Sequence, residues 1–171
     1  ELMCRSFQHM YDLDHNSVRY FNVYGPRMDN TGKYTEVLIR WYRLVKEGKR
    51  PLIYGSGKQA MDFVYIDDIA RATILALTSD TKNEVFNVAS GVDTSIEQLC
   101  YLMLEAMESD LKPEYIQIPD ERKSVEVMRR LGDTTKAKKL IGFETKVSLK
   151  KGLKELVKWL DTQEKPILQS V

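Results

Sequence analysis

The sequence has 171 residues, enough for one domain of ordinary size with its own core. Hydrophobic residues make up 43% and charged residues 30%, and 26 Lys and Arg against 25 Asp and Glu give a net charge of +1. This balance argues against a nucleic-acid-binding or anionic-membrane-binding protein, because both need a basic surface. No run approaches the ~18 apolar residues of a membrane span and no signal-peptide pattern opens the sequence, so we expect a cytoplasmic protein.

The few cysteines and histidines predict no metal site. Cys4 and Cys100 lie among apolar, helix-patterned residues, which favours reduced core cysteines over a disulfide. His9 and His15 lack metal-ligand spacing.

The first eleven residues predict a helix, because apolar residues recur there at helical spacing. No capping residue precedes the pattern, so we expect the helix to begin before Glu1. A polar turn at 12–17 leads into the stretch 18–24, whose β-branched and aromatic residues predict one buried strand. Gly25 and Pro26 then end it. Helix, short turn and strand in this order are typical of a doubly wound α/β unit.

Asn22 is a polar amide among apolar residues near the carboxyl end of that strand. A buried amide without a hydrogen-bond partner costs about 1–3 kcal/mol, so it needs one. Ligands bind at the carboxyl ends of strands in α/β sheets, which would make Asn22 a ligand contact. An asparagine that supports a neighbouring loop fits equally well, and the sequence leaves both interpretations open.

The rest of the chain alternates between helical and strand patterns, except for the charged segment 119–130, which has no clear pattern. The first predicted elements are a helix from Thr35 to Glu47, strands at 52–54 and 62–66 joined by a hairpin turn, and a helix capped by Asp67 or Asp68 and ending at Leu77. A strand at 85–89 follows, and then a helix to Met107 that Thr94 and Glu97 open as a capping box. The last elements are a short strand at 115–118, a helix capped by Asp133 or Thr134 and ended by Gly142, and a helix from Ser148.

The local motifs between these elements have structural explanations. Gly55-x-Gly57-Lys58 lacks the spacing of a P-loop, and a turn suffices. Tyr54, just before it, is either a core tyrosine or an aromatic ring that stacks on a ligand. The pair Asp67 and Asp68 is better explained as a helix cap than as an acid–base or metal-binding pair.

Two groups of basic residues are candidate anion ligands. The lysines between 136 and 154 lie on the polar faces of helices beside acidic residues, which favours a solvated surface. Arg122, Lys123, Arg129 and Arg130 lie in the unpatterned segment, where bidentate arginines are plausible phosphate ligands. No Ser-His-Asp, Cys-His or metal constellation is present, so we predict no catalytic residue.

Four blocks of sequence together carry a family resemblance. In this order, over nearly the whole chain, they resemble the extended short-chain dehydrogenases/reductases, and among these the NAD-dependent nucleotide-sugar epimerases and dehydratases, such as UDP-glucose 4-epimerase. The blocks are Arg19-x-Phe21-Asn22-Val23-Tyr24-Gly25-Pro26-Arg27, then Ile53-Tyr54-Gly55-x-Gly57-x-Gln59 with Asp62-Phe63-Val64-Tyr65-Ile66-x-Asp68, then Val85-Phe86-Asn87-Val88-Ala89-x-Gly91, and last Arg130-Leu131-x-Asp133-Thr134-x-Lys136-Ala137-x-x-Leu140-x-Gly142-Phe143.

The resemblance implies an α/β fold made of strands and helices from a doubly wound Rossmann-type domain plus the small substrate-binding domain of this family. It identifies residues 1–171 as a single C-terminal substrate-binding domain, with Rossmann-derived pieces near 1–27 and 83–107. The family's glycine-rich NAD loop and catalytic Tyr-x-x-x-Lys pair precede the first block, so the resemblance places both outside this sequence.

The resemblance also implies a set of site residues. One departure is Met61, because family members often carry an arginine at this position, immediately before the Asp-Phe pair, that contacts the diphosphate. Losing such a bond would cost about 1.5–3 kcal/mol unless another base compensates. The implied roles are Tyr20 and Phe21 for the nicotinamide end of NAD, Asn22 for the sugar diphosphate, Glu36 and Val37 for the nucleotide, Leu52 and Tyr54 for the base, Gln59 for the phosphate path, and Arg122 or Lys123 as a basic clamp.

The implied function is the nucleotide-sugar-binding half of an NAD-dependent sugar-nucleotide 4-epimerase, an isomerase that transfers hydride at sugar C4. We expect a UDP-sugar as the partner, no nucleic acid, no membrane, and a homo-oligomer. We expect the chain by itself to bind no NAD and to be inactive. The alternatives are a non-catalytic, self-associating or protein-binding module, and a fragment of a dehydratase or decarboxylase.

Overall fold

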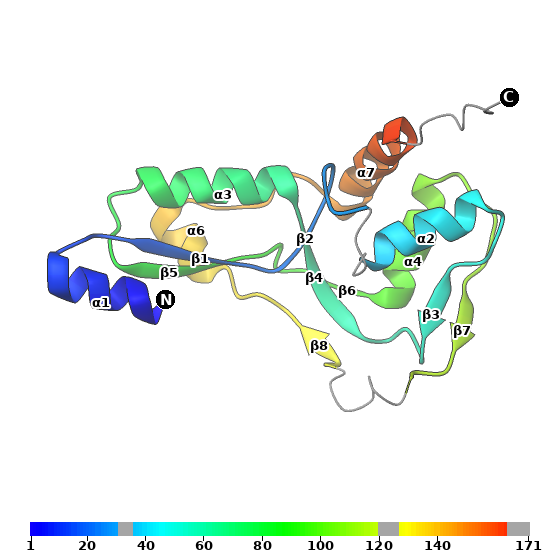
Figure 1. Ribbon diagram of the computed structural model, residues 1–171, viewed down its shortest axis with the longest axis horizontal. Helices are drawn as coiled ribbons and strands as arrows, with labels where there is room; N and C mark the ends of the chain where they lie inside the picture. Colours follow the sequence, from blue (N-terminus) through cyan, green and yellow to red (C-terminus); the bar gives the residue numbers. More distant parts are fainter. Residues whose placement is uncertain (31–35, 120–126, 164–171) are drawn as a thin grey trace, which may run out of the picture.

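The computed structural model describes residues 1–30, 36–119 and 127–163. It is elongated, with two helix-covered regions on either side of the long strand β4 (Ala60–Tyr65), as Figure 1 shows. The parallel strand pairs and their flanking helices confirm the predicted α/β class. No described helix combines the length and the apolar character needed to cross a membrane.

The first region is built on one parallel strand pair. Helices α3 and α6 pack on the pair around a small core that includes Ala72, Phe86 and Phe143. Helix α1 has no buried residue, and its Leu2 and Met3 side chains are 80% and 72% exposed. The elements are α1 (Leu2–Tyr11), β1 (Asn16–Tyr20), α3 (Ile66–Thr78), β5 (Glu84–Val88) and α6 (Thr135–Ile141).

The second region includes the sheet of β4 and holds the larger core. Buried side chains of α2, α4 and α7 pack together there, among them Trp41, Leu99 and Leu153. β2 and β6 pair with β4, β8 also pairs with β4, and β3 pairs separately with β7. The elements are β2 (Asn22–Tyr24), α2 (Val37–Lys46), β3 (Leu52–Tyr54), β6 (Asp93–Ser95), α4 (Ile96–Ala106), β7 (Glu114–Ile116), β8 (Arg129–Arg130) and α7 (Leu149–Gln163).

The single strand predicted at 18–24 is wrong, because the chain changes sheets at Phe21. β1 pairs with β5, whereas β2 pairs with β4. The Phe21 backbone N–H still donates to the Val88 carbonyl at 3.1 Å, so this residue is the last contact with the first sheet. Sequence pattern alone does not show this change, because both halves are equally strand-like.

The predicted hairpin between β3 and β4 is also wrong. The turn itself is present, and Gly55 and Gly57 have φ angles of 67° and 69°, a left-handed conformation that favours glycine. However, β3 pairs in parallel with β7, and β4 pairs with β2, β6 and β8. The two strands that flank the turn therefore lead into different sheets.

Several predicted helix caps lie elsewhere. Tyr65, not Asp67 or Asp68, is the N-cap residue of α3, and the Asp68 carboxylate instead accepts hydrogen bonds from the backbone of Lys146 and Val147. The capping box of α4 uses Ser95 and Gln98, one residue later than predicted. α2 begins after Glu36, and Thr35 lies outside the described residues.

Two short strands were not predicted. β6 occupies residues read as a helix cap, and β8 lies in the segment without a pattern. Other predictions are confirmed. Gly142 ends α6 in a left-handed conformation, and the Ser148 hydroxyl accepts from the backbone of Lys151 at the start of α7. Cys4 and Cys100 are both free thiols.

Candidate functional site

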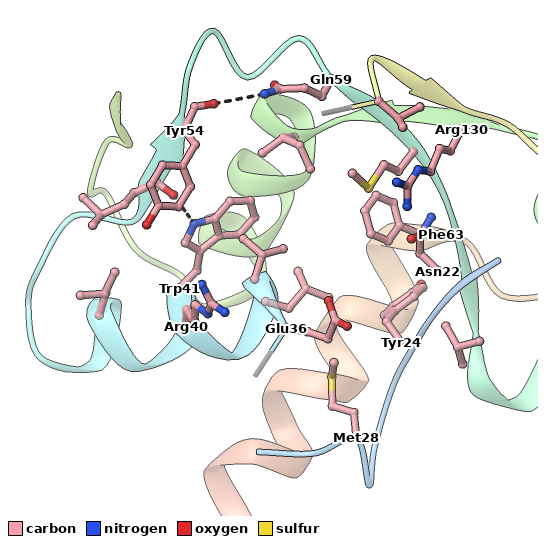
Figure 2. Close-up of a pocket in the computed structure, with 18 of the residues that line it drawn as sticks. Asn22, Tyr24, Met28, Glu36, Arg40, Trp41, Tyr54, Gln59, Phe63 and Arg130 are labelled. Atoms are coloured by element: carbon pink, nitrogen blue, oxygen red, sulfur yellow. Dashed lines mark hydrogen bonds between the residues drawn. The ribbon is translucent and has the colours of Figure 1, made fainter. Parts of the chain in front are cut away.

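A cavity of about 560 Å³ lies in the second region, between the face of β2, β4 and β8 and the elements α2 and β3. Its volume falls in the usual range of small-molecule sites, about 300–1,000 Å³. Figure 2 shows its two ends, with Trp41 and Tyr54 at one and Asn22, Phe63 and Arg130 at the other.

The strand register builds the second of these ends. Asn22 pairs with Phe63, and Arg130 pairs with Met61, both in parallel ladders. Residues two apart on a strand share a face, and register partners point to the same face as each other. Side chains from three strands far apart in sequence therefore converge on one wall of the cavity.

The opposite end is aromatic and apolar. The Trp41 indole N–H of α2 donates to the Leu52 carbonyl of β3 at 2.8 Å, which ties the helix to the strand. Tyr54, two residues on, and Ile118 complete this wall. Trp41 is only 2% exposed, so its orientation is fixed by core packing. Such a wall suits the flat face of a ring.

Gln59 lies between the two ends and is 6% exposed. Its side-chain amide donates to the Tyr54 backbone carbonyl at 3.3 Å, and the Gln59 backbone carbonyl accepts from the Ile96 backbone N–H at 2.9 Å. Gln59 thus connects the turn after β3 with the start of α4. Gln59 lines the cavity, and its predicted place on the phosphate path stays a prediction.

The structure brings most predicted substrate-binding residues together. Tyr20 and Phe21 do not line the cavity, and Arg122 and Lys123 lie outside the described residues. The predicted residues that line the cavity are Asn22, Glu36, Val37, Leu52, Tyr54 and Gln59.

The structure is consistent with both interpretations of Asn22, a structural support and a ligand contact. Its side-chain amide donates to the Asp62 carbonyl at 2.7 Å, so the amide has a structural partner across the strands. The residue also lines the cavity. Support of the strands is observed, and contact with a ligand stays a prediction.

Tyr20 and Phe21 test whether this chain can hold NAD. Tyr20 is 46% exposed, its hydroxyl lies 2.9 Å from the Thr73 hydroxyl, and Phe21 is half-buried beside Gly132. Exposed rings could contact a nicotinamide, but a dinucleotide also needs a glycine turn that opens a helix. The turn at Gly55 and Gly57 leads into strand β4 instead, so this turn does not supply that element.

Sequence reasoning did not single out Arg40, Trp41 or Phe63 as site residues, although all three line the cavity. Trp41 lies on the buried face of α2, and its ring belongs both to the core and to the cavity lining. Arg130 was noted only as one of several arginines in a segment without a pattern. Its strand pairing, which the sequence does not reveal, turns it into the cavity.

A Tyr-x-x-x-Lys spacing does occur within α2, at Tyr42 and Lys46, but it is structural. The Tyr42 hydroxyl donates to Asp161 at 2.7 Å, and the Lys46 ammonium donates to the same carboxylate at 2.8 Å. These bonds lower the pKa of the Asp161 carboxyl. The group joins α2 to α7, and neither Tyr42 nor Lys46 lines the cavity. Burial also raises the pKa of Tyr24 well above its ordinary value, so its hydroxyl stays protonated.

Several other polar side chains in the described part of the chain have structural partners. Within the described ranges, no three His, Cys, Asp or Glu side chains converge. Asp68 pairs with Arg71 and is 1% exposed, which makes it a structural carboxylate. Lysines on the surface pair with acidic neighbours, as Lys138 does with Glu144 at 2.6 Å and Lys150 with Glu105 at 2.5 Å.

This fold and cavity define an α/β protein with a small-molecule-sized cavity against a strand-lined wall. A family model described as the NAD dependent epimerase/dehydratase family matches residues 1–89, and the chain belongs to this family. The family resemblance of the sequence is thereby confirmed.

Named relatives narrow the comparison. The chain is 36% identical to UDP-glucuronate 4-epimerase of Thermodesulfobacterium geofontis, over 93% of this chain and 47% of that protein. It is 33% identical to UDP-N-acetyl-alpha-D-glucosaminuronate decarboxylase of Bacillus cytotoxicus, over 93% and 50%. The solved UDP-glucose 4-epimerase of Thermotoga maritima with UDP-glucose has a TM-score of 0.86 and 35% identity, over 96% and 51%. The chain spans about half the length of the curated relatives it matches.

Proposed function

We propose that this chain is the nucleotide-sugar-binding half of an NAD-dependent sugar-nucleotide 4-epimerase, and that its cavity holds a UDP-sugar. One observation carries the proposal. Residues that the family resemblance assigns to the substrate from separate parts of the sequence, at 22, 36, 37, 52, 54 and 59, all line one cavity.

The form of the cavity supports a nucleoside diphosphate linked to a sugar. One end offers the aromatic ring of Tyr54 for a base, and the end with Asn22 and Arg130 offers hydrogen-bond donors for an anion. The similarity to UDP-sugar enzymes supports the choice of UDP over other nucleotides.

The 4-epimerase assignment is the finer part of the proposal. In such an enzyme NAD would supply the hydride-transfer chemistry at the sugar. In this chain Tyr20 and Phe21 would lie at the cofactor side of β1 and Asn22 at the substrate side of β2, with the sheet change at Phe21 between them. The decarboxylase relative makes decarboxylation of a UDP-sugar acid the competing reaction. We propose that the 171-residue chain alone binds the sugar nucleotide, binds no NAD and turns nothing over.

Calorimetric titration of the 171-residue chain with UDP and UDP-glucose tests the binding. We expect binding by the wild type and a loss of about tenfold in affinity for Tyr54→Ala, since stacking on an aromatic ring contributes about 1–3 kcal/mol per base. Tyr101→Ala is the matched control, because Tyr101 is 49% exposed and does not line the cavity. Absence of binding at millimolar UDP would overturn the proposal.

We also propose that the chain forms a homo-oligomer through α1. The apolar side chains of this helix include Leu2, Met3, Phe7 and Met10, all exposed. Clustered exposed apolar side chains favour association. Light scattering should give a mass above 19.8 kDa, and Met3→Glu should lower it toward that value. A wild-type monomer at high concentration would contradict this proposal.

A further inference from the structure

The two arginines of β8 have opposite surroundings. Neighbouring residues on a strand point to opposite faces. Arg129 donates through Nε to the Asp93 carboxylate at 2.6 Å, so its charge is neutralised by a partner. Arg130 faces the cavity, and no carboxylate or other hydrogen-bond acceptor in the described parts of the chain pairs with its guanidinium.

The position of Arg130 is held by the backbone on both sides. The Ala60 N–H of β4 donates to the Met128 carbonyl at 2.9 Å, just before β8. Two residues after Arg130, the Gly132 N–H donates to the buried Asp62 carboxylate at 3.3 Å. The guanidinium therefore starts from a fixed strand, which lowers the entropy lost when it binds an anion.

Arg130 is the strand partner of Met61, the position at which the family resemblance leads one to expect an arginine. Met61 offers only a thioether to the cavity. The Arg130 side chain leaves the adjacent strand on the same face, and Figure 2 shows its guanidinium turned toward Asn22 and Phe63. The positive charge missing from β4 is thus present one strand away, in the same wall.

The other charged side chains that line the cavity lie away from Asn22. Glu36 and Arg40 come from α2, and in Figure 2 both lie across the cavity from Arg130. Arg40 also has an interaction partner, so its guanidinium is not free. Arg130 is the cation next to Asn22 that no described carboxylate neutralises.

We infer that Arg130 binds the diphosphate of the nucleotide sugar, taking over from β8 the contact that an arginine at position 61 of β4 would make. This inference rests on the proposed function. The guanidinium fork can hold two phosphate oxygens at once, which neither Met61 nor the Asn22 amide can do. A charge-assisted bond of this kind distinguishes a diphosphate from a neutral nucleoside.

The test titrates uridine, UMP and UDP into four forms of the 171-residue chain: wild type, Arg130→Met, Arg129→Met and the exchange variant Met61→Arg/Arg130→Met. We expect Arg130→Met to lower the UDP affinity about tenfold to a hundredfold, as for loss of one charge-assisted hydrogen bond. Uridine affinity should not change. Arg129→Met removes the same charge from the same strand on the other face, and should change UDP affinity less than threefold.

The exchange variant tests whether an arginine on β4 can replace the arginine on β8. Met61→Arg/Arg130→Met returns an arginine to β4 and should recover most of the lost UDP affinity. Circular dichroism and a thermal melt of each form check that the fold is kept. If Arg130→Met does not fold, Arg130→Lys replaces it in the titrations. Lysine keeps the positive charge but cannot hold two phosphate oxygens at once. The affinity of this variant for UDP should therefore fall more than its affinity for UMP.

The outcomes separate the two proposals. If the wild type binds UDP and Arg130→Met binds it equally well, or if Arg129→Met loses as much, the inference is wrong and the proposed function stands. If uridine and UDP affinities fall together in Arg130→Met, the residue shapes the cavity and the inference is again wrong. If the wild type binds no nucleotide, the proposed function fails and the inference fails with it.

Discussion

The two regions of the molecule differ in how completely their apolar side chains are buried. In the second region, Leu99, Cys100 and Leu153 are 0% exposed, and three helices close around the core. In the first region, β1 and β5 pair only with each other among the described strands, and α1 buries none of its residues. A two-stranded sheet is a poor independent unit, because it leaves both edges open. The comparison teaches that the cavity lies in the region with a complete core, and that the first region presents a surface suited to a partner.

The largest expected effect tests the difference in burial directly. Leu99→Ala in α4 should lower the free energy of unfolding by about 2–5 kcal/mol, because it leaves a void in a closed core. Leu77→Ala in α3 is the matched control, since Leu77 is 82% exposed, and it should stay within about 0.5 kcal/mol of wild type. Urea denaturation measures both. Equal effects would contradict the closed packing around Leu99.

The next effect concerns the joint between the regions. The Asp62 carboxylate, 0% exposed on β4, accepts from the backbone of Ser90 and Gly91 after β5 and of Gly132 after β8. Asp62→Asn places an N–H₂ group against these N–H donors and should cost about 1.5–3 kcal/mol. It should also weaken UDP binding, because the chain after Arg130 loses its anchor.

A thermal melt and a UDP titration of Asp62→Asn measure the two consequences. Asp80→Asn is the control, because Asp80 is exposed and lies at the end of α3, away from the joint. An Asp62→Asn protein that melts and binds UDP like wild type would mean that the regions are held together by packing alone.

The smallest effect uses the two cysteines, one in each region. Burial raises the pKa of the Cys100 thiol to about 12, so at pH 8 almost none of it is the reactive thiolate. Cys4 is half-buried on the exposed helix α1. A thiol reagent at pH 8 should therefore modify one thiol per chain quickly, at Cys4, and the second only on unfolding.

Labelling of the single variants Cys4→Ser and Cys100→Ser assigns each rate. If α1 lies in an interface, the rate at Cys4 should fall as the protein concentration rises, which sharpens the comparison further. Fast modification of Cys100 in the native protein would show that the second core opens readily.

The sequence by itself determined the α/β class, most helices and strands, and the family. These follow from local information, namely apolar spacing, turn residues such as Gly55 and Gly142, and ordered motifs. The family resemblance also predicted site residues, and those at 22, 36, 37, 52, 54 and 59 line the cavity. The caps at Asp67 and Thr94 were misplaced, because neighbouring polar residues compete for a helix start and tertiary contacts decide between them.

Only the tertiary structure decided the strand partners. The change of sheet at Phe21 and the separation of β3 from β4 depend on which strands pair across long stretches of chain. The local residue pattern does not specify such long-range pairing. The same holds for Arg130. As one of several arginines in a segment without a pattern it had no distinct role, but its pairing with Met61 places its charge in the wall of the cavity.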